Sequence, residues 1–151
     1  MMAATRMKTA LLMTFVVCAT ACGAVAPAST LTPYPTLSGS ALGDRPSTPV
    51  KIALVSPTNS QVVHGTSVLV KVSVTGGMVT KIISSHVTPT LGHVHLYLNN
   101  RLIYMSYTLQ QEVTVHPGLE YAMYAEFVAQ DHFPFSPRDV TPTVFFSVAA
   151  T

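Results

Sequence analysis

The sequence predicts an all-β domain of about seven strands that fold as a two-layer sandwich. From Val50 onward, apolar and polar residues alternate with period two, as in half-buried strands. Turn signals such as Thr75-Gly76-Gly77 and Pro117-Gly118 separate these stretches. No window of ten or more residues shows a convincing helical apolar stripe. About seven strands in roughly one hundred residues are typical of an immunoglobulin-like or fibronectin-III-like sandwich.

Each expected strand is a short stretch rich in β-branched and aromatic residues. The clearest alternation places Val68, Val70 and Val72 on one face. The expected strands cover residues 51–56, 67–74, 93–98, 101–105, 108–115, 121–130 and 143–148. Residues 79–83 are expected to add an edge segment, and residues 84–92 a loop.

The turn before residues 121–130 has the pattern apolar-x-Pro-Gly-x-x-Tyr. In fibronectin-III-like domains such a turn carries a tyrosine corner, whose hydroxyl bonds to backbone a few residues upstream. The spacing therefore predicts a tyrosine corner at Tyr121, with an ordinary hairpin and a core tyrosine as the alternative. The chain has no tryptophan, and both cysteines precede the domain, so it is not a close relative of antibody domains.

The first residues are typical of an export signal. Arg6 and Lys8 precede an apolar run, residues 10–21, that is too short to span a bilayer. Ala19-Thr20-Ala21-Cys22-Gly23 resembles a lipobox, with alanine where leucine is usual. We therefore expect a signal peptide at 1–21 and a lipid on Cys22, which would anchor the protein to the extracytoplasmic face of a membrane. The alternative is ordinary signal-peptidase cleavage, which would give a periplasmic or secreted protein.

The segment after Cys22 is predicted to be a tether. Residues 22–49 are rich in Pro, Ser, Thr, Ala and Gly, a composition that buries too little apolar surface to fold. The domain is then expected at 50–149. Because that domain contains no cysteine, disulfides, thiolate metal sites and cysteine nucleophiles are excluded from it.

Charge excludes one class of partner. The chain has eight basic and six acidic residues. Arg6 and Lys8 lie in the signal segment, so six of each sign remain after Cys22. Without a basic cluster, we expect no nucleic acid partner.

The best-defined expected strand begins with two histidines. Alternate side chains share a face, so His93 and His95 point one way, while Val94 and Leu96 point into the core. In an immunoglobulin-like sheet this strand pairs antiparallel with residues 121–130. The start of one strand then lies beside the end of the other, which brings His132 close to His93.

The histidines suggest a metal site as one hypothesis. Neutral imidazoles suit copper and zinc, so His93, His95 and His132 are candidate ligands. Asp131 and Glu126 are candidate partners that would hydrogen-bond to the rings and orient them. The alternative is a structural or polar surface cluster. No nucleophile and base are spaced to complete an enzyme.

The order Gly92-His93-Val94-His95, Pro117-Gly118, Asp131-His132-Phe133-Pro134 resembles an uncharacterised family of bacterial exported immunoglobulin-like domains. Its members pair a Gly-His-rich strand with a later Asp-His segment followed by proline. The resemblance spans about residues 50–149, and it implies fold and location rather than an activity. Members usually carry a denser histidine run, which Val94 interrupts here.

Two functions follow from the sequence. The first is a non-enzymatic lipoprotein module at the cell surface or in the periplasm, which binds a protein, glycan or envelope component through strand edges and loops. The second is an extracytoplasmic protein that binds copper or zinc through the histidines. No other cofactor is expected.

Overall fold

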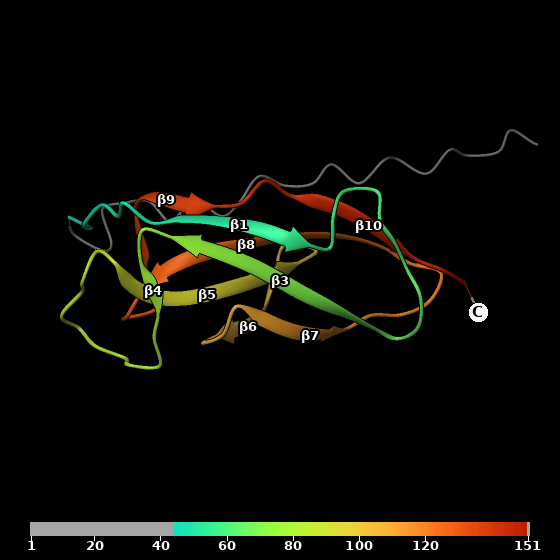
Figure 1. Ribbon diagram of the computed structural model, residues 1–151, viewed down its shortest axis with the longest axis horizontal. Coiled ribbons are helices and arrows are strands. Elements are labelled where there is room, and N and C mark those ends of the chain that lie inside the picture. Colours follow the sequence, from blue (N-terminus) through green and yellow to red (C-terminus); the bar gives the residue numbers. More distant parts are fainter. Residues whose placement is uncertain (1–43, 151) are drawn as a thin grey trace, which may run out of the picture. The chain divides into compact units, whose positions relative to one another are not determined.

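The computed structural model describes residues 44–150, which form a two-layer β-sandwich (Figure 1). The expected signal peptide, the lipidation site at Cys22 and residues 22–43 of the expected tether lie outside the described residues. No helix among residues 44–150 is long and apolar enough to cross a membrane.

The described part of the chain contains ten strands. They are β1 (Lys51–Ser56), β2 (Val62–Val63), β3 (Ser67–Thr75), β4 (Met78–Val79), β5 (Leu91–Leu98), β6 (Arg101–Ser106), β7 (Gln110–Thr114), β8 (Glu120–Ala129), β9 (Pro134–Val140) and β10 (Val144–Val148). The smaller sheet has the order β1-β3-β7, and the larger has the path β2-β10-β8-β5-β4. Beside this path, β6 pairs with β5 and β9 pairs with β8.

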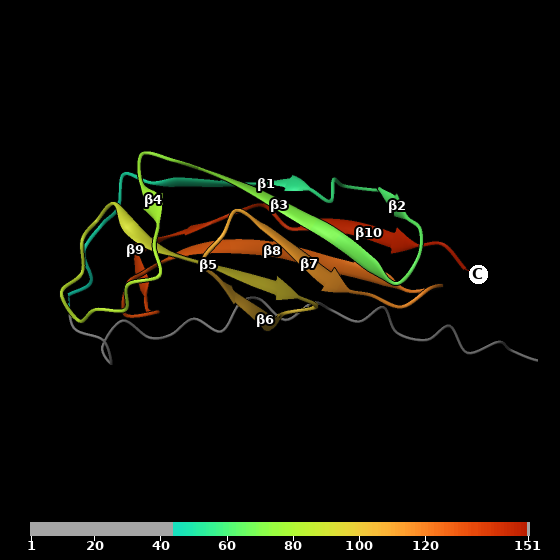
Figure 2. The same ribbon diagram turned by 60° about the horizontal axis from the view of Figure 1, so that its bottom comes forward.

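The core lies between the two sheets, which overlie one another in both views (Figures 1 and 2). Val70 and Val113 face it from the smaller sheet, and Leu96, Met123 and Phe127 from the larger; all five are at most 2% exposed. These are the residues that the period-two pattern assigns to the inside, so the alternation alone orients both layers.

The sandwich predicted from the sequence is confirmed, and so is its central pairing. Strands β5 and β8 are antiparallel, with His93 opposite Val128 and His95 opposite Glu126. The tyrosine corner is also confirmed, because the Tyr121 hydroxyl accepts a hydrogen bond of 2.9 Å from the backbone N–H of His116.

Two strands were not predicted from the sequence, the two-residue β2 and the longer β9. No strand is expected between residues 130 and 143, but Pro134–Val140 form β9. This strand pairs along β8 on one side, with Glu126 opposite Val140 and Phe127 opposite Asp139. Proline is tolerated in such an edge strand because its missing N–H is not needed by a second neighbour.

The residues just before the first strand belong to the domain rather than to the tether. Arg45 forms two hydrogen bonds with the Asp131 carboxylate, at 2.7 and 2.9 Å. Thr48 donates to the backbone oxygen of Pro89, and Val50 is fully buried. The expected boundary at residue 50 therefore falls inside the packed structure, which begins at least as early as Arg45.

Candidate functional site

The three histidines singled out from the sequence meet at one end of the larger sheet. His93 and His95 lie on β5, and His132 lies in the turn that follows β8. The ring centroids of His93 and His132 are 4.3 Å apart, and those of His95 and His132 are 5.6 Å apart. Both pairs are stacked, so the predicted proximity is observed, with the rings lying face to face.

Two backbone features make this approach feasible. A Cβ added at Gly92 would lie 2.0 Å from the backbone oxygen of Val128, so only glycine lets β5 start this close to β8. His132 has a φ of 64°, in the left-handed region that histidine adopts more readily than most residues. This turn places the His132 ring over the rings of β5.

His93 is completely buried and bridges two parts of the backbone. Its Nδ1 lies 2.8 Å from the carbonyl oxygen of Thr80, and its Nε2 lies 3.2 Å from that of Gln130. Tyr107 packs edge-on against the ring, with centroids 5.0 Å apart. Because both nitrogens face backbone oxygens, His93 ties the β4–β5 connection to the end of β8.

His95 and His132 interact directly. Nε2 of His95 and Nδ1 of His132 are 3.3 Å apart. Burial, then the neighbouring His132 and His93 rings, lowers the pKa of His95 to about 4. Burial, then His93, also lowers the pKa of His132, although Asp131 opposes this shift. Both rings are therefore neutral at pH 7, which is the state that can bind a metal ion or share a single hydrogen bond.

The two carboxylates expected to orient the rings are paired with arginines. Asp131 pairs with Arg45 and accepts from the Phe133 N–H, and these bonds hold its pKa below the ordinary value despite the opposing effect of burial. Glu126 accepts two hydrogen bonds of 2.6 Å from Arg138. Neither carboxylate is hydrogen-bonded to an imidazole, so neither orients a histidine ring as expected.

Glu126 belongs to a second polar cluster on the same face. It is 1% exposed, and besides Arg138 it accepts a hydrogen bond of 3.2 Å from the Tyr97 hydroxyl. Burial and the charge of Glu126 raise the pKa of Tyr97 to about 12. Tyr97 in turn stacks on Tyr124 at 4.5 Å. Arg138 was not identified from the sequence, because its position depends on the missed strand β9.

Among residues 44–150, no group of three or more His, Cys, Asp or Glu side chains is arranged to hold a metal ion. The arrangement explains this result for the three histidines. The nitrogens of His93 face carbonyl oxygens, and only His95 and His132 bring ring nitrogens toward one another.

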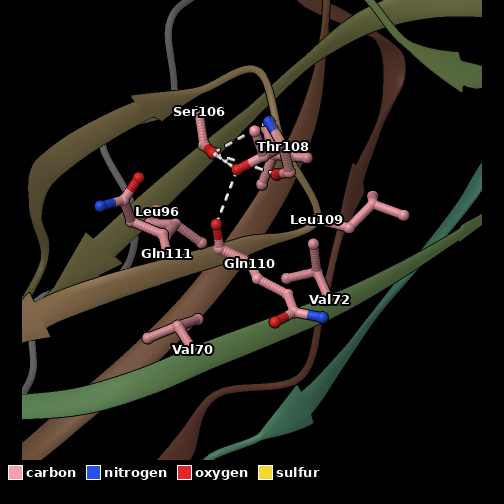
Figure 3. A pocket seen from close by; sticks show the side chains of 9 residues that line it. Val70, Val72, Leu96, Ser106, Thr108, Leu109, Gln110 and Gln111 are labelled. Carbon is pink, nitrogen blue, oxygen red and sulfur yellow. Dashed lines mark hydrogen bonds between the residues drawn. The ribbon is translucent and has the colours of Figure 1, made fainter.

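A shallow apolar recess lies between β3 and β5, where the β6–β7 connection crosses the side of the sandwich (Figure 3). Val70, Val72 and Leu96 line it. Its hydroxyl groups bond within the connection itself, since Ser106 donates to the Thr108 carbonyl at 3.0 Å and Thr108 to the Gln110 carbonyl at 2.6 Å. The recess is thus part of the seam between the sheets.

Strand β6 forms an exposed apolar rim of the larger sheet. Within the described part of the chain it pairs with a single strand, β5. Leu102, Tyr104 and Met105 are 39%, 38% and 52% exposed. We call these three residues the β6 rim. Sequence reasoning placed this strand correctly but gave no reason to single it out.

Comparison with known proteins finds similarity to solved structures but to no family model and no curated protein. Nine chains of solved structures match. One, described as "Structures of Clostridium thermocellum CbhA fibronectin(III)-like modules", is 16% identical, with a TM-score of 0.48. The match covers 66% of this chain and 97% of that one.

Proposed function

We propose that the protein is an exported, non-enzymatic binding module, held at a membrane by a lipid on Cys22. The signal-like residues 1–21 and the lipobox-like sequence around Cys22 support the location. The pairing of polar groups supports a non-catalytic role. The nitrogens of His93 lie against two carbonyl oxygens, Asp131 is held by Arg45, and Glu126 is held by Arg138. These groups stabilise the fold instead of facing a substrate.

The β6 rim is the observation that carries the binding role. A strand with one neighbour presents unpaired backbone groups, and three exposed apolar side chains accompany them here. Such an edge is suited to an extended polypeptide, which adds a strand by backbone hydrogen bonds and places alternate side chains on the rim. The partner we propose is therefore a protein segment in extended conformation.

Photocrosslinking in the producing cells tests this role. A benzophenone amino acid replaces Met105 on the rim or, as a matched control, Leu69 on the smaller sheet, which is 46% exposed. We expect a discrete protein adduct from Met105 and none from Leu69. Equal labelling at both positions, or no protein adduct from the rim, would refute a protein-binding rim; the latter would favour a glycan.

A second candidate function is the binding of copper or zinc. It is favoured by the distance between one ring nitrogen of His95 and one of His132. Two imidazole nitrogens that bind one tetrahedral ion at ~2.0–2.1 Å lie roughly 3.3–3.4 Å apart. Nε2 of His95 and Nδ1 of His132 have that separation. With two protein ligands, the remaining positions would be filled by water.

Titration with Cu(II) and Zn(II) tests this second function. Wild type is compared with His95→Ala and with His64→Ala, which removes an exposed turn histidine. Binding tighter than micromolar that is lost only in His95→Ala would support the metal site. Weaker binding, or equal binding by both variants, would exclude it.

A further inference from the structure

The connection between β4 and β5 presents an apolar tip. Ile82 and Ile83 are consecutive and 63% and 65% exposed. Isolated exposed apolar residues are common, whereas two adjacent large ones in one loop form a small apolar surface. Lys81, Ile82 and Ile83 are here called the isoleucine tip.

Backbone hydrogen bonds hold the isoleucine tip at both of its ends. The N–H of Thr80 donates to the Gly92 oxygen at 2.9 Å, and the N–H of Ser84 donates to the Gln130 oxygen at 3.2 Å. Nδ1 of His93 lies 2.8 Å from the carbonyl oxygen of Thr80, the residue that precedes the tip. The tip is therefore preformed, so little ordering cost opposes its binding.

The tip lies at the end of the domain where the N-terminal part of the chain arrives. Ser84 bonds to Gln130, and the next residue, Asp131, is held by Arg45. Thr48 bonds to Pro89 in the same connection. Figures 1 and 2 both show the β4–β5 connection and the first described residues at one end. A membrane attached through the N-terminal segment is therefore nearest to this end.

The charge within the tip itself is positive, and the exposed Asp44 lies outside it, beside Arg45. Lys81 is exposed beside the two isoleucines. Residues 80–90 contain no acidic residue, and the neighbouring Asp131 is neutralised by Arg45. Apolar side chains that enter the acyl boundary, with a basic residue at headgroup level, are the pattern of an interfacial membrane contact.

We propose that the isoleucine tip inserts into the surface of an anionic phospholipid membrane and orients the anchored domain on it. This inference rests on the proposed lipid at Cys22, which brings the domain to the membrane. The tip and the β6 rim are formed by different segments of the domain, so the proposed contact does not use the rim residues.

Depth-dependent quenching tests the contact. The lipidated protein is placed in vesicles of phosphatidylethanolamine and phosphatidylglycerol that contain brominated lipid. A fluorescent label is attached at Ser85→Cys, beside the tip, or at His116→Cys, in an exposed turn at the other end of β8. We expect the label at position 85 to be quenched and the label at 116 to be unaffected. Equal fluorescence at both positions would overturn the proposal.

A matched pair of variants separates insertion from anchoring. Ile82→Ser with Ile83→Ser should abolish the quenching at position 85, while the lipid keeps the protein on the vesicles. Leu119→Ser with Val62→Ser removes similarly exposed apolar groups elsewhere (50% and 55% exposed) and should change nothing. Quenching that survives in the isoleucine variant would contradict insertion.

Whether Cys22 carries the proposed lipid is determined independently, by mass spectrometry of the mature N-terminus. If Cys22 carries no lipid, the proposed anchor is wrong, and the unlipidated full chain is floated with concentrated vesicles. Binding that falls roughly 100-fold in the double isoleucine variant would still support the tip, in line with the apolar area removed. No measurable binding, or binding unchanged by the substitutions, would overturn it.

Discussion

The two sheets of the sandwich bury their residues in different ways. In the smaller sheet β3 alternates, with Val68 and Val70 buried and Leu69 46% exposed. In the larger sheet β8 is buried along nine consecutive residues, with Glu126 on the outer face as hidden as Ala125 on the inner face. A sheet with one wet face needs only apolar alternation, whereas a sheet buried on both faces must also pair its polar side chains.

The larger sheet meets this requirement with side chains from β5, from β9 and from the turn after β8. Arg138 of β9 pairs with Glu126, and Tyr97 bonds to the same carboxylate. His132, from the turn after β8, covers His93. Removing one of these paired or closely packed groups of the larger sheet should therefore lower the free energy of unfolding more than removing a similar group with an exposed or unconstrained environment.

The close approach of β5 to β8 should be the most sensitive point. Gly92→Ala places a Cβ within 2.0 Å of the Val128 oxygen, so the two strands must separate. We expect a loss of about 3 kcal/mol or more in the free energy of unfolding. Gly65→Ala, before β3, meets no atom within 4 Å but has a φ of 93°, and it should cost only about 1–2 kcal/mol. Urea denaturation of both variants measures the difference, and equal losses would contradict it.

Acid should destabilise the larger sheet through His95. Its pKa is about 4 in the folded protein and 6.5 in the unfolded chain, so between these values the unfolded chain binds more protons. The contribution of His95 to the free energy of unfolding is therefore fully present above pH 6.5. About 3 kcal/mol of it is lost as the pH is lowered through 4. Denaturation across this range checks the slope. His95→Gln should flatten the profile and His64→Gln should not; parallel profiles would show that His95 is not responsible.

The buried ion pair should matter more than a surface pair of the same charge type. Arg138→Met leaves the Glu126 carboxylate buried without its partner, which we expect to cost about 2 kcal/mol, since Arg138 is partly exposed. Lys51 lies 3.9 Å from Asp139, with its side chain 77% exposed, so Lys51→Met should cost under ~0.5 kcal/mol. Thermal unfolding of both variants measures the two losses. Similar decreases in Tm would contradict a larger contribution from the buried pair.

The tyrosine corner should give the smallest effect. Tyr121→Phe keeps the ring on Phe146 but removes the bond from the His116 N–H, and we expect a loss of about 1 kcal/mol. Tyr104→Phe, on the exposed rim, serves as the control and should leave the free energy of unfolding unchanged. Chemical denaturation measures both; a loss of the same size in the control would contradict the role of the corner.

The sequence was sufficient for the features that depend on strand register. Period-two alternation predicts both layers, and the pairing of β5 with β8 brings His132 to His93. The sequence was insufficient for contacts that depend on the direction in which a side chain points. The rings of His93 and His132 stack instead of converging, and Glu126 turns to Arg138, which reaches it only because β9 exists. The isoleucine tip was also missed, since adjacent apolar residues in a loop look like a strand until the backbone shows their exposure.

The affinity of the partner captured at Met105 tests the central claim, that the larger sheet carries the binding surface. It is measured for wild type and for two double variants with matched exposure. Leu102→Ser with Met105→Ser alters the β6 rim, and Leu69→Ser with Leu109→Ser alters the smaller sheet. We predict at least a roughly 10-fold loss for the rim variant, as expected for apolar contacts at the centre of an interface, and none for the other. Unchanged affinity in the rim variant, or an equal loss in both, would contradict the account.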